Sequence, residues 1–265
     1  MSTWANNIAL LVAASFLSLA GAAQAETRLS FSTGVDYTSG EYGGEETTEV
    51  ISVPFGARLT VDDWTFRVSA SYLHVTGPAD ISEDAETGES AGTIVRDGSE
   101  KGIGDTTISA EWAIRRTADT DAYVELTGRV RLPTGDEERG LGTGAVDYGT
   151  MVEAGVSSDI GGAYVAAGYR FLGERDEGPD RQDGMQAGVG AWLPIGNRVR
   201  VGAFANWREA SRDDRDDPAN AGAYVSFRMS ERLRVTLTGS GGLSDASPDY
   251  SAGIRFNWLP SALND

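Results

Sequence analysis

Between Thr27 and Trp258 the chain contains twelve segments, of about nine to thirteen residues, in which apolar side chains occupy every second position. In the second segment, for example, one face carries Ile51, Val53, Phe55, Ala57 and Leu59, and the other carries Ser52, Gly56 and Arg58. A period of two predicts β-strands with one apolar and one polar face, whereas a helix would repeat every 3.6 residues. A tilted strand of about nine to eleven residues is long enough to cross the hydrocarbon core of a bilayer.

The connections between these segments alternate between short and long. Short turns are expected at residues 61–63, 117–120, 159–162, 195–198 and 230–232, and longer connections at about 39–49, 76–104, 133–146, 173–183, 209–220 and 242–248. This alternation is typical of outer-membrane barrels, which have short periplasmic turns and longer outer loops. We therefore predict an all-β fold, a closed transmembrane antiparallel β-barrel of about twelve strands, with both termini in the periplasm. A soluble lipid-binding barrel in the periplasm is the remaining architectural alternative.

Residues 1–25 have the pattern of a secretory signal peptide. The apolar run from Ile8 to Leu19 is too short to span a bilayer, and Ala23-Gln24-Ala25 supplies a small-x-small cleavage pattern, although no Lys or Arg precedes the run. We expect cleavage before Glu26, export to the cell outer membrane, and a barrel domain covering residues 26–265. No later segment approaches about 18 consecutive apolar residues, so no transmembrane helix is predicted.

Aromatic side chains gather at both ends of the predicted apolar face. Beside the short turns or the C-terminus lie Trp64, Trp112, Phe227 and Trp258. Beside the long connections lie Tyr37, Tyr72, Tyr148, Tyr169, Trp207 and Tyr250. Amphipathic rings form girdles at the two interfaces of a membrane, whereas a soluble core has no need to sort them to its ends. We predict two aromatic girdles.

The polar face of the strands is rich in arginine. It carries Arg58, Arg67, Arg115, Arg129, Arg131, Arg170, Arg200, Arg208, Arg228, Arg234 and Arg255, with the carboxylates Asp36, Glu111, Glu125 and Glu153. If the apolar face meets lipid, these side chains line the lumen. A basic lumen would attract anions, because charged rings set selectivity at close range. Alternatively, Arg and Glu pair across neighbouring strands and fill a narrow barrel.

Most of the acidity that gives the net charge of −18 lies in the long connections. Acidic runs occur at residues 136–138, 176–177, 213–214 and 216–217. Carboxylates suit Ca²⁺ and Mg²⁺, but none of these runs has EF-hand spacing, so we expect solvated outer loops and leave divalent-cation binding open. The chain has no cysteine, which excludes disulfides and thiolate metal sites. We predict no metal site and no cofactor.

The sequence offers little support for an enzyme. Its one histidine, His74, is followed by Val75 and Thr76, so the His-x-Ser arrangement of outer-membrane phospholipase A is missing. The glycines at 140, 142 and 144 have no Lys-Ser/Thr partner and no following helix, which argues against a nucleotide site. No catalytic residue and no nucleic-acid partner are predicted.

Residues 100–150 contain motifs that go beyond strand periodicity. They are Gly102-Ile103-Gly104-Asp105, Leu132-Pro133-Thr134-Gly135-Asp136, Gly140-Leu141-Gly142-Thr143-Gly144 and Asp147-Tyr148. In these motifs the chain resembles the family of outer-membrane proteins named after the meta-pathway of phenol degradation. The resemblance implies a small barrel, encoded near aromatic-catabolism genes, that passes hydrophobic or aromatic compounds. The motifs are expected to shape loops.

The leading functional hypothesis is a channel for passive passage of small molecules, including hydrophobic or aromatic compounds. One alternative is an anion-selective small porin that uses the lumenal arginines. Another is a structural or adhesive barrel with a filled lumen. The expected partners are outer-membrane lipid and lipopolysaccharide, the barrel-assembly machinery during biogenesis, and a small-molecule solute.

Overall fold

The computed structural model describes residues 27–42, 46–78, 83–84, 89–90, 98–115, 122–175, 181–213 and 215–260. Within these ranges every regular element is a β-strand. None of the described segments forms a helix long and apolar enough to cross a membrane. The predicted signal peptide, the predicted turn at 117–120 and the acidic pair at 176–177 lie outside the described residues.

The described part of the chain contains fifteen strands. They are β1 (Thr27–Gly40), β2 (Thr48–Val61), β3 (Trp64–Thr76), β4 (Glu83–Asp84), β5 (Glu89–Ser90), β6 (Ser99–Ile103), β7 (Thr106–Arg115), β8 (Ala122–Leu132), β9 (Asp147–Ser158), β10 (Gly161–Phe171), β11 (Gly184–Ile195), β12 (Val199–Arg208), β13 (Ala219–Arg228), β14 (Leu233–Gly242) and β15 (Tyr250–Trp258).

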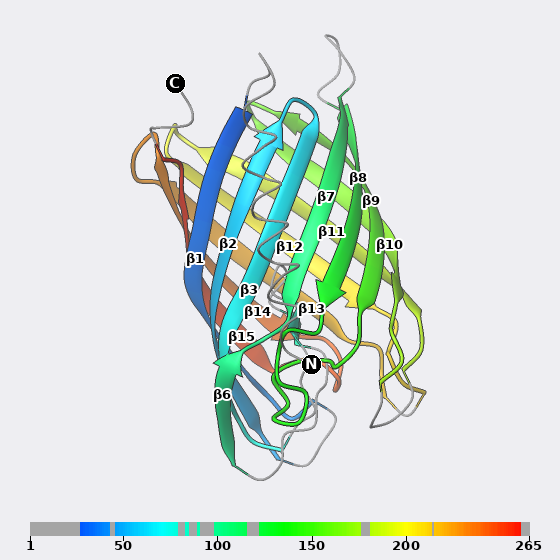
Figure 1. The fold of residues 1–265 in the computed structure, drawn as a ribbon. Helices are drawn as coiled ribbons and strands as arrows, with labels where there is room; N and C mark the ends of the chain where they lie inside the picture. The colour runs from blue at the N-terminus through cyan, green and yellow to red at the C-terminus, as the bar shows by residue number, and fades with distance from the viewer. Residues whose placement is uncertain are drawn as a thin grey trace.

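The sheet closes on itself because β1 pairs with both β2 and β15 (Figure 1). Every pairing in the ring is antiparallel, and apart from β1 with β15 and β3 with β6 and β7 each joins strands that follow one another in the chain. The sheet has 13 strands, but β6 and β7 pair with successive halves of the same edge of β3, so they share one position in the ring. The result is a closed barrel with twelve strand positions, which confirms the predicted fold class.

One connection differs from the prediction. Residues 76–104 were expected to form a single long connection, yet β6 lies within it and extends the barrel wall beside β3 (Figure 1). Its sequence, Ser99-Glu100-Lys101-Gly102-Ile103, has no apolar alternation from which a strand could be predicted. Period-two patterning arises only where one strand face is apolar, and a strand that extends beyond a bilayer has no such requirement.

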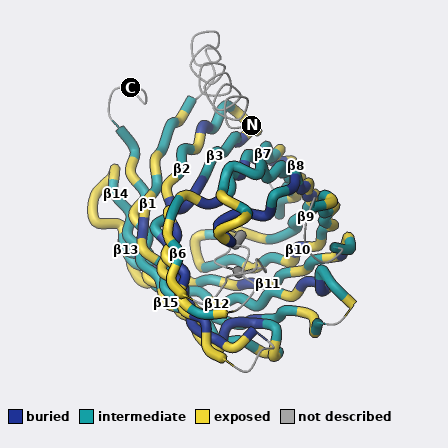
Figure 2. The backbone as a smooth tube through the Cα atoms, turned by 60° about the horizontal axis from the view of Figure 1, so that its bottom comes forward, coloured by how far each residue is buried: buried dark blue, intermediate teal, exposed yellow. Residues whose placement is uncertain are grey.

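The apolar face of the strands points outward. Val165 and Leu193 are 60% exposed, and Val156 is 53% exposed, although each lies in the middle or second half of a regular strand. In Figure 2, exposed residues alternate with less exposed ones along the strands of the ring. In a water-soluble protein the apolar side chains would point into the core. Apolar side chains that point outward instead suit a barrel that is surrounded by lipid. The four described short turns lie at one end of the barrel, hereafter the short-turn end, and the described parts of the long connections lie at the other, the long-loop end (Figure 1).

Aromatic rings line both ends of this outer surface. At the short-turn end, Trp64 stacks on Trp112 with ring centroids 6.1 Å apart. Trp258 stacks in the same way on Phe31, also at 6.1 Å. At the long-loop end, Tyr37 and Tyr250 contact each other across β1 and β15 at 6.0 Å. The other rings there are on the same outer surface, with exposures of 43% for Tyr72, 54% for Tyr148, 38% for Tyr169 and 38% for Trp207.

Candidate functional site

The strands enclose two adjoining cavities, of about 350 and 330 Å³. The first lies against β15, β1, β2 and β3, and its lining includes Arg58, Arg67 and Asn257. The second extends from β10 and β12 across β14 and β15 to β1, and its lining includes Tyr164. Arg255 lines both cavities. The interior formed by the described strands is therefore hollow.

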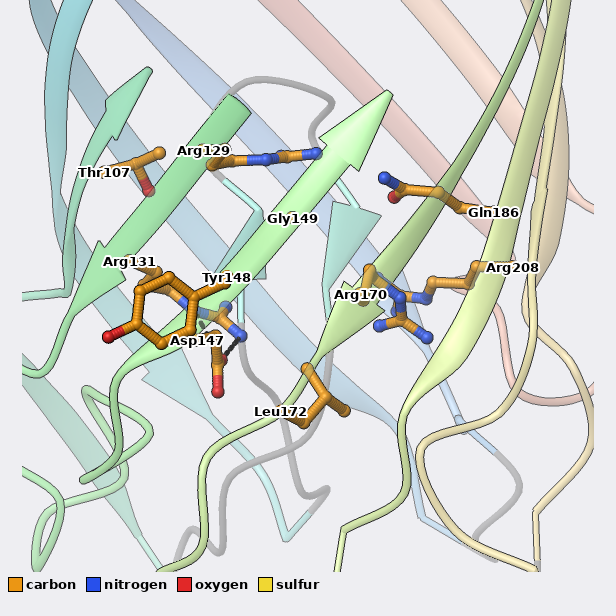
Figure 3. A pocket seen from close by; sticks show the side chains of 10 residues that line it. All are labelled: Thr107, Arg129, Arg131, Asp147, Tyr148, Gly149, Arg170, Leu172, Gln186 and Arg208. Carbon is orange, nitrogen blue, oxygen red and sulfur yellow. Dashed lines mark hydrogen bonds and ion pairs between the residues drawn. The ribbon is translucent and has the colours of Figure 1, made fainter. Parts of the chain in front are cut away.

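Four arginines gather near the long-loop end of this interior, and we call them the arginine cluster: Arg129, Arg131, Arg170 and Arg208. They come from β8, β10 and β12, and their side chains converge on one small pocket (Figure 3). Gly149 of β9 stands in register between Arg129 and Arg170, and a side chain there would contact Arg129 Nε at 3.5 Å. The glycine leaves room for the long guanidinium groups to lie along the wall.

Asp147 is the carboxylate that lies within the arginine cluster. It accepts hydrogen bonds from Arg131 Nε at 2.9 Å, from both terminal nitrogens of Arg181 at 2.9 Å, and from the backbone N–H of Gly173 at 2.9 Å. A further contact joins Arg131 Nη2 to Asp147 Oδ2. The side chains of Asp147 and Arg181 are each only 6% exposed. Asp147 therefore fastens the connection that follows β10 to the barrel wall.

Two further ion pairs join neighbouring strands on the inner face. Arg67 Nη1 lies 2.9 Å from Glu111 Oε2, and Arg255 Nη2 lies 2.9 Å from Asp36 Oδ2. Arg58 stands in register with Arg67 and lines the same cavity. Cross-strand Arg–carboxylate pairs of this kind are also expected in a barrel whose lumen is filled by side chains. In this barrel, however, both pairs border the cavities.

Two glutamates oppose each other on β8 and β9. Glu125 is in register with Glu153, and Glu153 Oε1 accepts a hydrogen bond of 2.7 Å from the hydroxyl of Tyr123. The tyrosine hydroxyl stabilises one carboxylate of this like-charged pair. The side chain of Arg115, at the end of β7, lies outside the described residues.

A second group of arginines lies towards the short-turn end, on β12, β13 and β14. The guanidinium carbon of Arg200 lies 3.9 Å from the centroid of the Trp192 ring, which is a cation–π contact. Arg228 and Arg234 stand directly in register on β13 and β14. Among the described residues, no carboxylate forms an ion pair with Arg228 or Arg234. Positive charge therefore occupies both ends of the inner face.

Five aromatic side chains also point inward, and the girdle prediction did not include them. We call them the inlaid rings: Tyr123, Tyr164, Trp192, Phe204 and Tyr224. Each ring covers a glycine on the neighbouring strand, where an added Cβ would lie 2.4 to 2.7 Å from the nearest atom of that ring; the covered glycines are Gly155, Gly190, Gly162, Gly222 and Gly202, respectively. Such contacts leave no space for any larger residue at the glycine. The sequence contains a signal for these ring–glycine contacts, because the polar faces of adjacent segments carry both aromatic residues and glycines.

The family-like motifs of residues 100–150 converge on one carboxylate, that of Asp105. It accepts hydrogen bonds from the backbone N–H of Gly135 at 3.0 Å, and from the N–H and the hydroxyl of Thr143 at 2.8 and 2.9 Å. Gly142 packs so closely that an added Cβ would lie 2.5 Å from Asp105 Oδ1. As expected, the motifs shape a loop: they hold the connection between β8 and β9 against the start of β7.

The same connection carries a hydrophobic anchor. Leu141 is 3% exposed and packs in a small core with Tyr42, Val50, Leu73 and Val75. This core occupies the long-loop end. There the connections after β1 and β8 meet the ends of β2 and β3.

Polar contacts tie the remaining connections together at the long-loop end. Arg139 binds Glu100 Oε2 through two nitrogens at 2.9 and 2.7 Å, and the carboxylate raises the pKa of Arg139. Arg215, between β12 and β13, donates a 2.5 Å hydrogen bond to the carbonyl oxygen of Tyr42, between β1 and β2. The loops of this end are therefore packed against one another over the barrel.

His74 lies on the outer surface, where its Nε2 is 2.6 Å from the hydroxyl oxygen of Ser99. In the part of the chain that the structure describes, no carboxylate is hydrogen-bonded to His74. The described residues also contain no group of three or more His, Asp or Glu side chains placed to hold a metal ion.

Comparisons with known proteins agree with this architecture. The family model described as "Putative MetA-pathway of phenol degradation" matches residues 48–259. The solved NanC porin covers 87% of this chain and 99% of its own, with a TM-score of 0.56 and 8% identity. The KdgM porin covers 86% and 98%, with a TM-score of 0.51 and 6% identity, and the CymD monoaromatic hydrocarbon channel covers 90% and 89%, with a TM-score of 0.45 and 9% identity.

No curated protein has a sequence that matches the chain. At such low identities the structural matches show a shared fold, that of a closed outer-membrane barrel. This fold and the family match assign the protein to the outer membrane.

Proposed function

The chain belongs to the MetA-pathway of phenol degradation family, and we propose that it is an outer-membrane channel for the passive passage of small molecules. The observation that carries the proposal is the hollow interior, with adjoining cavities of about 350 and 330 Å³ inside a barrel whose outer surface is apolar. A barrel that only anchored or stiffened the membrane would gain from filling this space with side chains.

The proposal includes a preference for anions. The arginine cluster places four guanidinium groups around a pocket that contains one carboxylate, Asp147. The predicted polar faces of all strands together carry eleven arginines and four carboxylates, and a wall with more positive than negative side chains lowers the energy of an anion and raises that of a cation. Among the described acidic residues of the long connections, Asp136, Glu138, Asp213, Asp216 and Asp217 are exposed, so water and salt screen their charges.

Passage of hydrophobic or aromatic compounds also belongs to the proposal, because the family resemblance implies it. The inlaid rings support it in part, since they give the polar interior an apolar strip. The alternative of a structural barrel draws support from the Arg67–Glu111 and Arg255–Asp36 pairs. Those pairs, however, border the cavities and do not close them.

We further propose the route to the membrane. Residues 1–25 would direct export and be removed, and the barrel-assembly machinery would insert the mature chain with its long connections outside. The aromatic rings at the long-loop end would then contact lipopolysaccharide, and those at the short-turn end would contact the phospholipid leaflet. Glu26 as the first residue of the purified protein, found by N-terminal sequencing, would test the cleavage.

Reconstitution of the purified protein in planar bilayers tests the channel. We expect stepwise conductance, together with swelling of liposomes in small neutral solutes. An absence of both would contradict a channel and favour a structural barrel.

Reversal potentials in a KCl gradient test the anion preference. Replacing Arg129, Arg170 and Arg208 by Gln should shift the permeability ratio of chloride to potassium several-fold towards unity. Arg232→Gln removes one positive charge from an exposed turn at the other end and should leave the ratio nearly unchanged. A cation preference in the wild-type protein, or equal ratios in both variants, would contradict the anion preference.

A further inference from the structure

The cavity of about 330 Å³ has a floor formed by two of the inlaid rings, Tyr164 and Phe204. The outer half of the Tyr164 ring lies over Gly190, and Phe204 Cζ lies over Gly222, with 2.5 and 2.6 Å between each nearest ring atom and an added Cβ. One part of each ring is therefore held against the wall while the ring also borders the cavity. Both rings are fixed in place, so stacking on them requires little loss of side-chain entropy.

Small hydroxyl groups surround this floor on β14, β15 and β1. Thr236, Thr238, Ser240 and Ser251 all line the cavity. The hydroxyls of Ser240 and Ser251 are 2.5 Å apart and share one hydrogen bond, and Thr236 donates to Ser226 at 3.0 Å. A hydroxyl can donate once and accept twice, so these contacts leave much of the hydrogen-bonding capacity open to a ligand.

The remaining wall of the cavity includes the ion pair of Asp36 with Arg255. The pair contributes a carboxylate that can accept from ligand hydroxyls and a guanidinium that can donate to them. Its charges cancel, so the cavity does not require a charge on its ligand. This charge balance distinguishes the cavity from the arginine cluster, which lines a different pocket.

We propose that this cavity is a binding site for a neutral sugar, in which a six-membered hydroxylated ring stacks on Tyr164 and Phe204 while its hydroxyls bond to the serines, threonines and Asp36. A sugar ring has an apolar C–H face and a polar rim, and the cavity offers a matching surface to each. An aromatic hydrocarbon would use the rings but would leave the hydroxyls desolvated without partners, which is unfavourable. A volume near 300 Å³ is at the lower limit of ligand sites and suits one or two sugar rings.

The inference deepens the proposed channel function, because the site would lie on the path of the solute. Its test therefore has one part that does not depend on conduction. Saturation-transfer NMR on the detergent-solubilised barrel, with maltose as the probe, should show transfer to the ring protons of the sugar. Phe204→Ala combined with Tyr164→Ala should reduce this transfer at least about fivefold, since each lost stacking contact weakens binding several-fold.

Two control variants test whether a reduced transfer could result from misfolding of the barrel. Phe204→Tyr keeps a ring over Gly222 and should keep the transfer, and Phe256→Ala removes a ring from the outer surface, where it is 38% exposed, and should leave the transfer unchanged. Equal transfer in the wild type and the double variant would overturn the proposal. So would transfer to benzoate but not to maltose.

Single-channel recording supplies the second part of the test. If the barrel conducts, maltose should interrupt the current, and Phe204→Ala should shorten the interruptions about five- to tenfold. Conductance without any interruption by maltose would overturn the sugar site and leave the channel intact. Transfer by NMR without conductance would leave the sugar site intact and contradict the channel.

Discussion

The carboxylate of Asp105 accepts hydrogen bonds from both the backbone N–H and the side-chain hydroxyl of Thr143, 38 residues further along the chain. A third bond comes from the N–H of Gly135. One side chain at the start of β7 thus determines the path of the connection between β8 and β9, which packs over the long-loop end. The stability of this loop should be separable from that of the barrel wall, because strand pairing does not depend on Asp105.

Asp105→Asn should release this connection. The amide has one oxygen acceptor where the carboxylate has two and loses the charge that strengthens each bond, so we expect local destabilisation of about 1–3 kcal/mol. Trypsin should then cut after Arg139 several-fold faster than in the wild type, while the barrel resists digestion. Asp159→Asn, in the short turn between β9 and β10, is the matched control and should leave the rate unchanged. Equal cutting of Asp105→Asn and the wild type would contradict the role of Asp105.

Asp147→Asn should destabilise the folded barrel strongly. The substitution leaves Arg131 and Arg181 without their carboxylate in a site where the side chains are 14% and 6% exposed. Removing one partner of a buried pair typically costs about 3–5 kcal/mol. The temperature at which the folded band is lost in SDS gels should fall accordingly.

Glu100→Gln offers a comparison with an exposed ion pair. Arg139 and Glu100 are 45% and 37% exposed, and ion pairs that are this exposed contribute little to stability because water and salt screen them. The gel transition should therefore move much less than in Asp147→Asn. Equal shifts in the two variants would mean that burial does not set the strength of these pairs.

Gly190→Val should narrow the interior. Its Cβ would lie 2.5 Å from Tyr164 Cε1, so the ring must leave the wall and enter the cavity. Overpacking of this kind destabilises by about 1–3 kcal/mol, and the displaced ring should lower single-channel conductance. Gly128→Val is the control, because nothing lies within 4 Å of a Cβ at that position. Unchanged conductance in Gly190→Val would show that Tyr164 does not border the conducting path.

Fluorescence of single-tryptophan variants should separate the two faces of the wall. Trp112 is 40% exposed on the outer surface, whereas Trp192 lies beneath Arg200 on the inner face. Lipids brominated in the acyl chain should quench Trp112 and leave Trp192 nearly unaffected, and aqueous acrylamide should do the reverse. Strong quenching of Trp192 by brominated lipid would contradict the orientation of β11.

Several features of the fold could be predicted because they depend on local pattern. Val165 and Leu193 each belong to a run of apolar residues at every second position, and a period of two assigns each strand residue to one of two faces, here the exposed outer one. The short turns follow from the same pattern, because they interrupt it for only a few residues. Strand β6 could not be predicted, because a strand without an apolar face leaves no periodic trace.

The sequence by itself determined the architecture: a closed barrel with an apolar outer surface, arginines on the inner face and acidic residues in the long connections. Only the tertiary structure decided which inner residues meet. Arg255 reaches Asp36 across 219 residues because β15 closes on β1, and Arg181 reaches Asp147 because a connection folds back on the wall. These contacts depend on strand register and loop path, which are set by the sum of many distant pairings. The inlaid rings follow the same rule, since each needs a glycine at the matching height of the next strand.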